Sequence, residues 1–306
     1  MHGTWTIHLA QEVHTLPMLK DAGAIALESL QDFFAGDTFQ LAAALSYYTL
    51  LSIAPLLLVL TGAAGLLLGE EQVREALVSQ VRDLVGDEGA QLLETVARNA
   101  GTQHSNIVSM VTGFILMIFG ATTVFAQLQA ALNRVWGVKA APSNAVLGFI
   151  RSRLVSLTVV LGLAFMLLVS LVFSAAISAL QAYLEAFLPG SAVMWTIANH
   201  AVSLVLVALL LAMLFRYVPD VEISWRDTIA GALVTAILLT LGKYAIGVYL
   251  GRAGVGSAYG AAGSAVIFMV WVYFVSVILF LGAGITRVIA RHRGTPLVPS
   301  AHATKI

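Results

Sequence analysis

Residues 227–250 read DTIAGALVTAILLTLGKYAIGVYL, and this stretch determines the class of fold. After Asp227 it holds aliphatic, small and hydroxyl residues and a single charged side chain, Lys243. A helix needs about 20 apolar residues to cross the roughly 30 Å hydrocarbon core of a bilayer. The stretch therefore predicts a transmembrane helix that carries one ionisable group within it.

The rest of the sequence has the same character. Of 306 residues, 59% are hydrophobic and 10% are charged, and the mean hydropathy is +0.91. Soluble domains carry about 25% charged residues, so the composition indicates an integral membrane protein. The apolar runs are continuous, which favours helices over an alternating barrel pattern. We predict an all-α protein with six transmembrane helices, near 40–68, 105–126, 148–180, 194–216, 227–250 and 262–290.

The basic residues predict the orientation of these helices. Eleven of the sixteen fall on one side: Lys20, Arg134, Lys139, Arg151, Arg153, Arg216, Arg226, Arg287, Arg291, Arg293 and Lys305. Four fall on the other side, at Arg74, Arg82, Arg98 and Arg252, and Lys243 lies within a span. Cytoplasmic loops carry the excess of basic residues, so both termini are predicted to be cytoplasmic. No basic segment followed by an apolar core opens the chain, so we expect no cleavable signal peptide.

Three regions flank or interrupt the spans. Residues 1–37 are predicted to be a cytoplasmic segment whose stretch 16–34 forms an interfacial helix. Residues 38–290 form the six-helix membrane domain, and residues 291–306 a cytoplasmic tail. Within the membrane domain, residues 70–100 predict an amphipathic helical hairpin on the outer side, between helices 1 and 2. This hairpin is either a cap packed over the bundle or a lid that gates a substrate.

The first span contains polar residues and a proline. At 100° per residue, Tyr48, Ser52 and Pro55 share one face of residues 42–69, AAALSYYTLLSIAPLLLVLTGAAGLLLG. Pro55 leaves the carbonyl of Leu51 without its helical donor, which a bilayer does not satisfy. This face should therefore point into the bundle, either as a packing kink or as the lining of a polar cavity.

Lys243 is the candidate functional residue of the fifth span. The helical period places it on one face with Thr228, Ala232, Ala236, Thr240 and Gly247. An ionisable residue inside a membrane is by default a functional candidate. We expect Lys243 to reach the polar face of the first span near Ser52. The alternative is that its ammonium group snorkels to the outer headgroups.

The sequence lacks the motifs that are typical of several kinds of enzyme and metal site. The chain has no cysteine, no histidines spaced with carboxylates as metal ligands, no Walker A loop and no GxSxG elbow. The acids between the fourth and fifth spans are Asp220, Glu222 and Asp227. We therefore predict no catalytic residues, no metal, no cofactor and no nucleic-acid partner, and a protein that is not an enzyme.

Three further stretches stand out: YTLLSIAPLL (48–57), FAQLQAALNRVWGV (125–138), and residues 216–250 with 258–284, from RYVPDVEISWRDTIAG to FVSVILFLGAG. Together they resemble the YihY/BrkB family of bacterial inner-membrane proteins, members of which have been labelled ribonuclease BN, virulence factor or transporter. The resemblance implies a multi-pass protein of the inner (cytoplasmic) membrane with six spans. It carries over Ser52, Pro55, Asn133, Trp136, Tyr217, Pro219, Gly231, Lys243, Tyr249, Tyr259 and Gly260 as recurrent positions. Members often have Glu where this chain has Gly284.

These observations predict a transporter or flippase. Spans one, five and six would enclose a polar cavity lined by Tyr48, Ser52, Pro55, Thr240, Lys243 and Tyr259. The cavity would move an anionic lipid, an amphiphile or a small solute, with membrane lipids as partners and an oligomer compatible with this arrangement. The alternative is a membrane scaffold that binds a partner through the hairpin 70–100. A membrane-bound ribonuclease using Asp220 or Glu222 is the third hypothesis.

Overall fold

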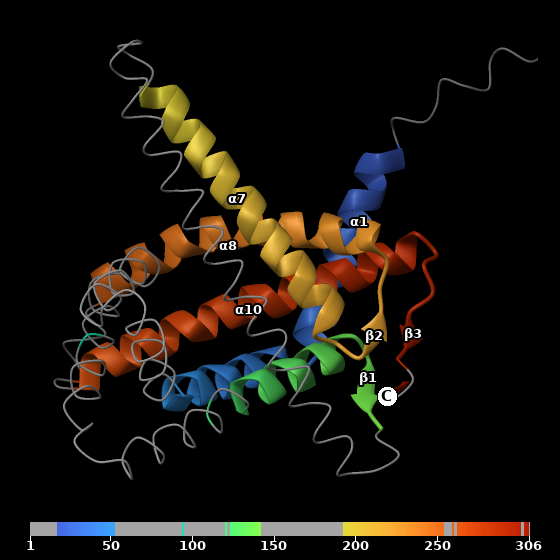
Figure 1. Cartoon of the computed structure of the whole chain (residues 1–306), viewed down its shortest axis with the longest axis horizontal. Helices are drawn as coiled ribbons and strands as arrows, with labels where there is room; N and C mark the ends of the chain where they lie inside the picture. The colour runs from blue at the N-terminus through green and yellow to red at the C-terminus, as the bar shows by residue number, and fades with distance from the viewer. Residues whose placement is uncertain are drawn as a thin grey trace, which may run out of the picture.

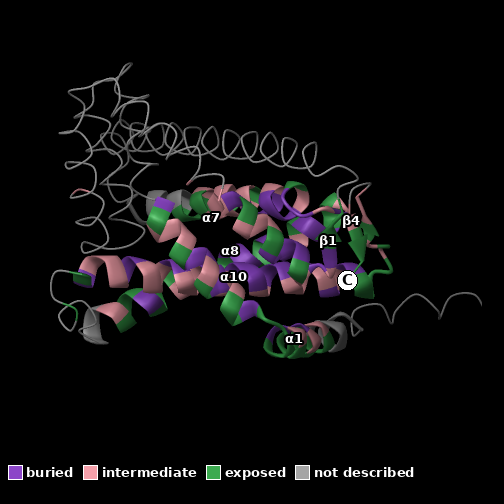
Figure 2. Ribbon diagram, turned by 90° about the horizontal axis from the view of Figure 1, so that it is seen from below, coloured by how far each residue is buried: buried purple, intermediate pink, exposed green. Residues whose placement is uncertain are grey.

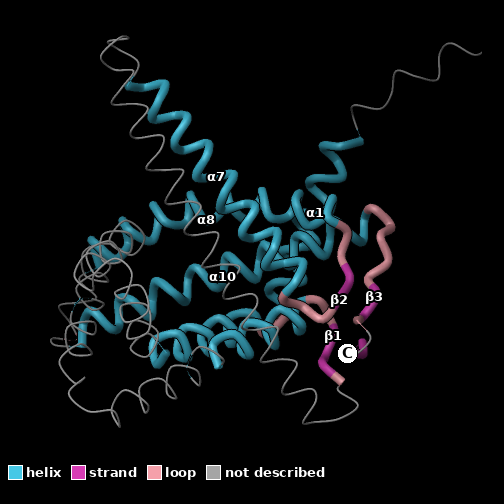
Figure 3. Tube along the Cα trace, in the orientation of Figure 1, coloured by secondary structure: helices cyan, strands magenta, loops and turns pink. Residues whose placement is uncertain are grey.

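The computed structural model describes residues 17–52, 94, 120, 123–141, 192–253, 259, 262–300 and 303–305. Its helices are α1 (Pro17–Ala35), α7 (Ala192–Tyr217), α8 (Trp225–Ala253) and α10 (Gly263–His292), and residues 38–52 and 123–135 are also helical. Short strands are β1 (Val138–Ala140), β2 (Val221–Glu222), β3 (Val298–Pro299) and β4 (Ala303–Lys305). Helices dominate the described chain, and the strands gather at one end (Figures 1 and 3).

Three of the described helices are long and apolar enough to cross a membrane. They are His200–Tyr217 in α7, Trp225–Leu250 in α8 and Gly263–His292 in α10. They coincide with the fourth, fifth and sixth predicted spans, because long apolar runs are the strongest local signal in a sequence. The six-span count, the cytoplasmic termini and the outer position of residues 70–100 stay predictions. Apart from Glu94, the predicted hairpin lies outside the described residues.

Helices α8 and α10 pack antiparallel through small residues. Gly231 of α8 lies against Thr286 of α10, and Gly282 of α10 lies against Thr235 of α8. Each threonine hydroxyl donates within its own helix, Thr235 Oγ1 to the Gly231 carbonyl at 2.7 Å and Thr286 Oγ1 to the Gly282 carbonyl at 2.8 Å. The missing side chain of each glycine thus admits the threonine of the opposite helix, and the two backbones approach closely.

The contact face of α8 follows a seven-residue spacing. One row runs through Thr228, Thr235 and Gly242, and Gly242 meets Ile278 of α10. Alongside it lie Ala232 and Ile246, which are also buried. A straight helix drifts by about 20° per seven residues relative to such a repeat, so the seam winds around α8. By position 243 the seam has turned towards residues 242 and 246.

The end of the bundle formed by residues 136–141, 217–225 and 293–305 is called the strand end below. There Gly294, with φ of 68°, stops α10, and the Thr295 amide donates to the Ala290 carbonyl at 3.0 Å. This is a Schellman arrangement, which needs a left-handed residue. The chain then runs back as two strands: β3 pairs with β2, and β4 pairs with β1, both antiparallel. The protein is mostly helical, as predicted, and the two small sheets that the residues after α10 form with earlier loops are additional to that prediction.

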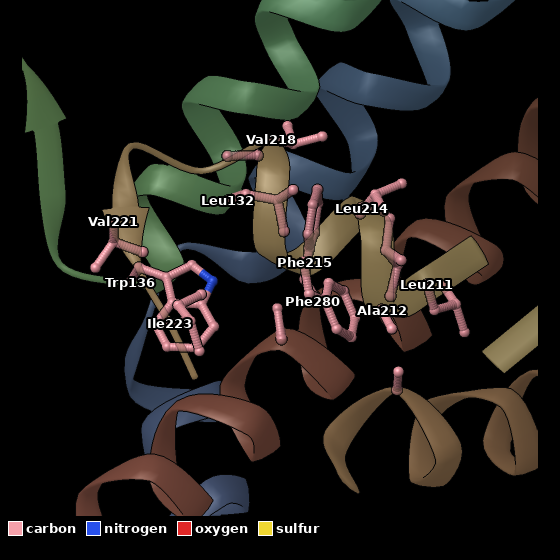
Figure 4. Close-up of a cluster of buried hydrophobic side chains, with 14 of the residues drawn as sticks. Leu132, Trp136, Leu211, Ala212, Leu214, Phe215, Val218, Val221, Ile223 and Phe280 are labelled. Carbon is pink, nitrogen blue, oxygen red and sulfur yellow. The ribbon is translucent and has the colours of Figure 1, made fainter. Parts of the chain in front are cut away.

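The largest cluster of buried apolar side chains lies near the strand end. Phe215 of α7, Phe280 of α10 and Leu132 are fully enclosed, with Trp136 and Val218 beside them (Figure 4). Figure 2 shows buried residues along the facing sides of α8 and α10, whereas α1 lies outside this bundle and is largely exposed. The core therefore fixes the ends of α7, α8 and α10 relative to one another.

Candidate functional site

Lys243 is exposed on α8, whereas Ile246, on the next turn, is buried. It has no hydrogen bond or ion pair with any other described residue. Trp225, whose ring lies 4.9 Å from the Arg216 guanidinium carbon, marks the strand end of the same helix. Eighteen residues at about 1.5 Å each place Lys243 about 27 Å further along, close to the thickness of the hydrocarbon core. Lys243 thus lies far along α8 from the strand end, towards the other end of a helix that is long enough to cross a membrane.

Ser52 is buried and has a different neighbour from the one expected. Its hydroxyl donates to the carbonyl of Gly120 at 2.9 Å. A side chain at Gly120 would lie 3.3 Å from Ser52 Cβ, so the two backbones are close at this point. This bond joins the first predicted span to the second, and it occupies the hydroxyl that was expected to face Lys243.

The other predicted lining residues are dispersed. Tyr48 is half-buried and packs edge-on against Tyr47, with ring centroids 5.7 Å apart. Thr240 is exposed and donates within α8 to the Ala236 carbonyl at 2.8 Å. Tyr259 is exposed. Pro55 lies outside the described residues, and among the described members no hydrogen bond joins one to another, so the shared cavity stays a prediction.

The predicted face of α8 is divided in the structure. Ala232 and Ala236 are fully buried, whereas Thr240, Lys243 and Gly247 are exposed. The prediction used a period of 3.6 residues, but the contact with α10 follows seven-residue spacing, so the two diverge along the helix. Lys243 consequently belongs to the outward side of α8 and not to its packed side.

Asp220, the acid of the ribonuclease hypothesis, is held by amide side chains. Asn133 Nδ2 donates to one carboxylate oxygen at 2.7 Å, and the Asp220 amide donates back to Asn133 Oδ1 at 2.7 Å. Gln129 Nε2 lies 3.3 Å from both carboxylate oxygens. The Ser300 amide donates to the Asp220 carbonyl at 3.0 Å. Asp220 therefore ties the loop after α7 to residues 123–135 and to the segment after α10.

Asp227 is equally engaged at the start of α8. Its side chain is 2% exposed, and it accepts bonds from Arg293 Nη1 and Thr295 Oγ1, both at 2.8 Å. The Ser224 hydroxyl accepts a bond from the Arg226 amide at 3.3 Å, as at the N-cap of a helix. In the part of the chain that the structure describes, no three His, Cys, Asp or Glu side chains lie together as metal ligands would.

The sequence did not predict that Asp220 pairs with Asn133 or that Asp227 pairs with Arg293 and Thr295. Asn133 was singled out only through the family resemblance, and Asp220 only as an acid in a short loop. The sequence does carry one signal: Asn133 lies near the end of a predicted helix, and Asp220 follows another span. Such residues often join two loops, but these two are 87 residues apart, and the sequence does not show that they pair with each other.

Comparison with known proteins gives the family. The family model described as virulence factor BrkB matches residues 29–306. The chain belongs to the virulence factor BrkB family. The resemblance seen in the sequence is thereby confirmed over most of the chain. No solved structure matches this chain.

Relatives in this family are named as membrane proteins. A UPF0761 membrane protein of Stenotrophomonas maltophilia (strain R551-3) is 26% identical over 265 residues, which are 85% of this chain and 59% of that protein. A relative from Methylibium petroleiphilum is 29% identical over 280 residues, which are 90% of this chain and 63% of that protein. The chain spans about three fifths of the length of these curated relatives. With the three apolar helices, these names make this BrkB-family chain a membrane protein.

Proposed function

We propose that this BrkB-family protein translocates an anionic lipid, an amphiphile or a small anionic solute across a bacterial inner membrane. The proposal includes six spans with both termini in the cytoplasm, and it treats the chain as a transporter and not an enzyme. The observation that carries it is the position of Lys243. This lysine is the one charge between Thr228 and Gly251 of α8, and it is exposed on an otherwise apolar helix face.

The surroundings of Lys243 support binding of an anionic group. Thr240 and Gly247 lie one turn before and one turn after Lys243, and both are exposed. An anionic group that approaches the ammonium group along the helix would therefore meet a hydroxyl and a residue without a side chain. A lysine in apolar surroundings gains most from an anionic partner such as a phosphate, because few other groups there compensate its charge. Tyr244 and Tyr249, which follow Lys243 within two turns of α8, are also exposed, and such aromatic residues are enriched at membrane interfaces.

The ribonuclease hypothesis has less support from the geometry. A metal-dependent nuclease needs carboxylates free to ligate a cation or to move a proton. Both oxygens of Asp220 already accept amide bonds, and both oxygens of Asp227 accept bonds from Arg293 and Thr295. These acids connect the loops of the strand end, which is a structural task.

The test is lipid translocation in liposomes that contain anionic phospholipid. Wild type, Lys243→Leu and Lys243→Arg are reconstituted with a fluorescent phosphatidylglycerol, and a membrane-impermeant reductant reports the labelled lipid that reaches the outer leaflet. We expect rapid exchange with wild type and Lys243→Arg, and at least a tenfold slower rate with Lys243→Leu. Size-exclusion profiles of the three purified proteins serve as the folding control.

Two other outcomes would contradict the proposal in different ways. Equal rates for wild type and Lys243→Leu would remove Lys243 from the pathway and leave it as an anchor among the headgroups. No exchange with wild type would exclude passive translocation of this lipid. The same vesicles would then be loaded with a small organic anion, and the absence of its flux would favour the membrane scaffold.

A further inference from the structure

The two faces of α1 have the reverse polarity of a helix at a water-exposed surface. Its outward face presents Leu27, Leu30 and Phe34, which are 60%, 45% and 69% exposed. Both acids between residues 23 and 35, Glu28 and Asp32, lie on the opposite side, towards α10. In water the exposed apolar side chains would stay hydrated, while the half-buried acids lose part of their contact with solvent. An apolar medium outside α1 accounts for this arrangement.

The inward face of α1 is fixed by charged groups at the end of α10. Arg287 Nη2 donates to Asp32 at 2.7 Å, and its Nη1 donates to the Val135 carbonyl at 2.6 Å. Arg291 pairs with Glu28, and His292 Nε2 lies 2.7 Å from the other oxygen of Glu28. The helix thus cannot turn its acids outward without breaking these contacts. Its rotation about its own axis is set by α10.

The position of α1 also fits a membrane surface. In Figure 1, α1 lies beside the strand end of α8 and α10, the end at which the basic residues gather. Phe39, exposed in the first turn of the helix 38–52 that follows, has its ring 5.1 Å from that of Phe33 and extends the apolar surface.

We propose that α1 is an interfacial anchor that inserts Leu27, Leu30 and Phe34 into the acyl boundary of the leaflet at the strand end. Lipid is the occupant because the chain is a membrane protein and α1 is held by ion pairs against the end of α10, a helix long and apolar enough to cross a bilayer. A helix that lies in the plane buries its apolar side about 5–10 Å into the boundary. The basic residues at this end predict the cytoplasmic leaflet. This inference does not depend on transport.

Spin-label accessibility tests the inference directly, because the chain has no native cysteine. Leu30→Cys and Phe34→Cys are labelled with a nitroxide in the reconstituted full chain. Thr304→Cys, exposed in β4, is the aqueous control, and Val205→Cys, exposed in the apolar part of α7, is the lipid control. Relaxation of each label is measured with oxygen, which concentrates in lipid, and with a water-soluble nickel chelate.

We expect the labels at positions 30 and 34 to resemble that at position 205: high accessibility to oxygen and at least fivefold less to the nickel chelate than at position 304. Access to the nickel chelate equal to that at position 304 would place this face in water and overturn the proposal. Low access to both reagents would overturn it in favour of a protein surface, such as a second copy of the chain.

Discussion

The crossing of α8 and α10 predicts that Gly282→Ala destabilises the protein. A Cβ at position 282 would lie 2.7 Å from Thr235 Cβ, whereas ordinary contact begins at 3.4 Å. Rotation of the Thr235 side chain exchanges its methyl and hydroxyl groups but does not move this carbon. The two helices must therefore separate by about 0.7 Å, and overpacking of this kind costs about 1–3 kcal/mol.

Gly284→Ala is the matched control for this substitution. Position 284 lies two residues along the same helix, and a Cβ there meets nothing within 4 Å. Alanine is favoured over glycine in a helix by up to about 1 kcal/mol, so this variant should be as stable as wild type or more stable. The two variants make the same chemical change, and the difference between them isolates the contact with Thr235.

The measurement is the free energy of unfolding in mixed micelles, from a titration with sodium dodecyl sulfate followed by far-UV circular dichroism. We expect Gly282→Ala to be less stable than Gly284→Ala by about 2 kcal/mol or more. Equal free energies for the two variants would show that α8 and α10 do not approach closely at this point. The antiparallel register described above would then be wrong.

Two further predictions concern the strand end. Asn133→Leu removes both of its side-chain bonds to Asp220 and should lower the free energy of unfolding by about 2–3 kcal/mol. Its control, Arg134→Leu, removes only an exposed ion pair with Asp37 and should lower it by less than about 1 kcal/mol. Similar losses for the two variants would refute the role of Asp220 in joining the loops of the strand end. Asp227→Asn should cost about 1–3 kcal/mol, discounted because Arg293 is half-exposed, and an unchanged unfolding titration would contradict the buried pairing.

The sequence allowed the three C-terminal spans to be predicted because each is a long apolar run. It also allowed a helix to be expected at residues 16–34, where the structure has α1, since apolar positions there recur with the helical period; the interfacial location of this helix stays a prediction. The strands could not be predicted in the same way. β2 and β3 have two residues each, too few for any alternation of polar and apolar residues, and they exist because the chain after α10 returns to the loop after α7.

The site residues show a second limit. The sequence marks Ser52 and Lys243 as polar residues within apolar runs. In the structure Ser52 donates a hydrogen bond to the Gly120 carbonyl, and Lys243 is exposed. Their neighbours depend on how helices cross, which no local pattern contains. The row through Thr228, Thr235 and Gly242 drifts by about 40° around α8, and Lys243 lies beyond it on the exposed surface.

The pairing of β1 with β4 has a consequence for the synthesis of the protein. β1 lies at residues 138–140, and its partner at residues 303–305 leaves the ribosome only after α10 has been made. β1 therefore stays without its partner strand until every later span has been synthesised. Closure of the two small sheets would then report that the last span has been inserted.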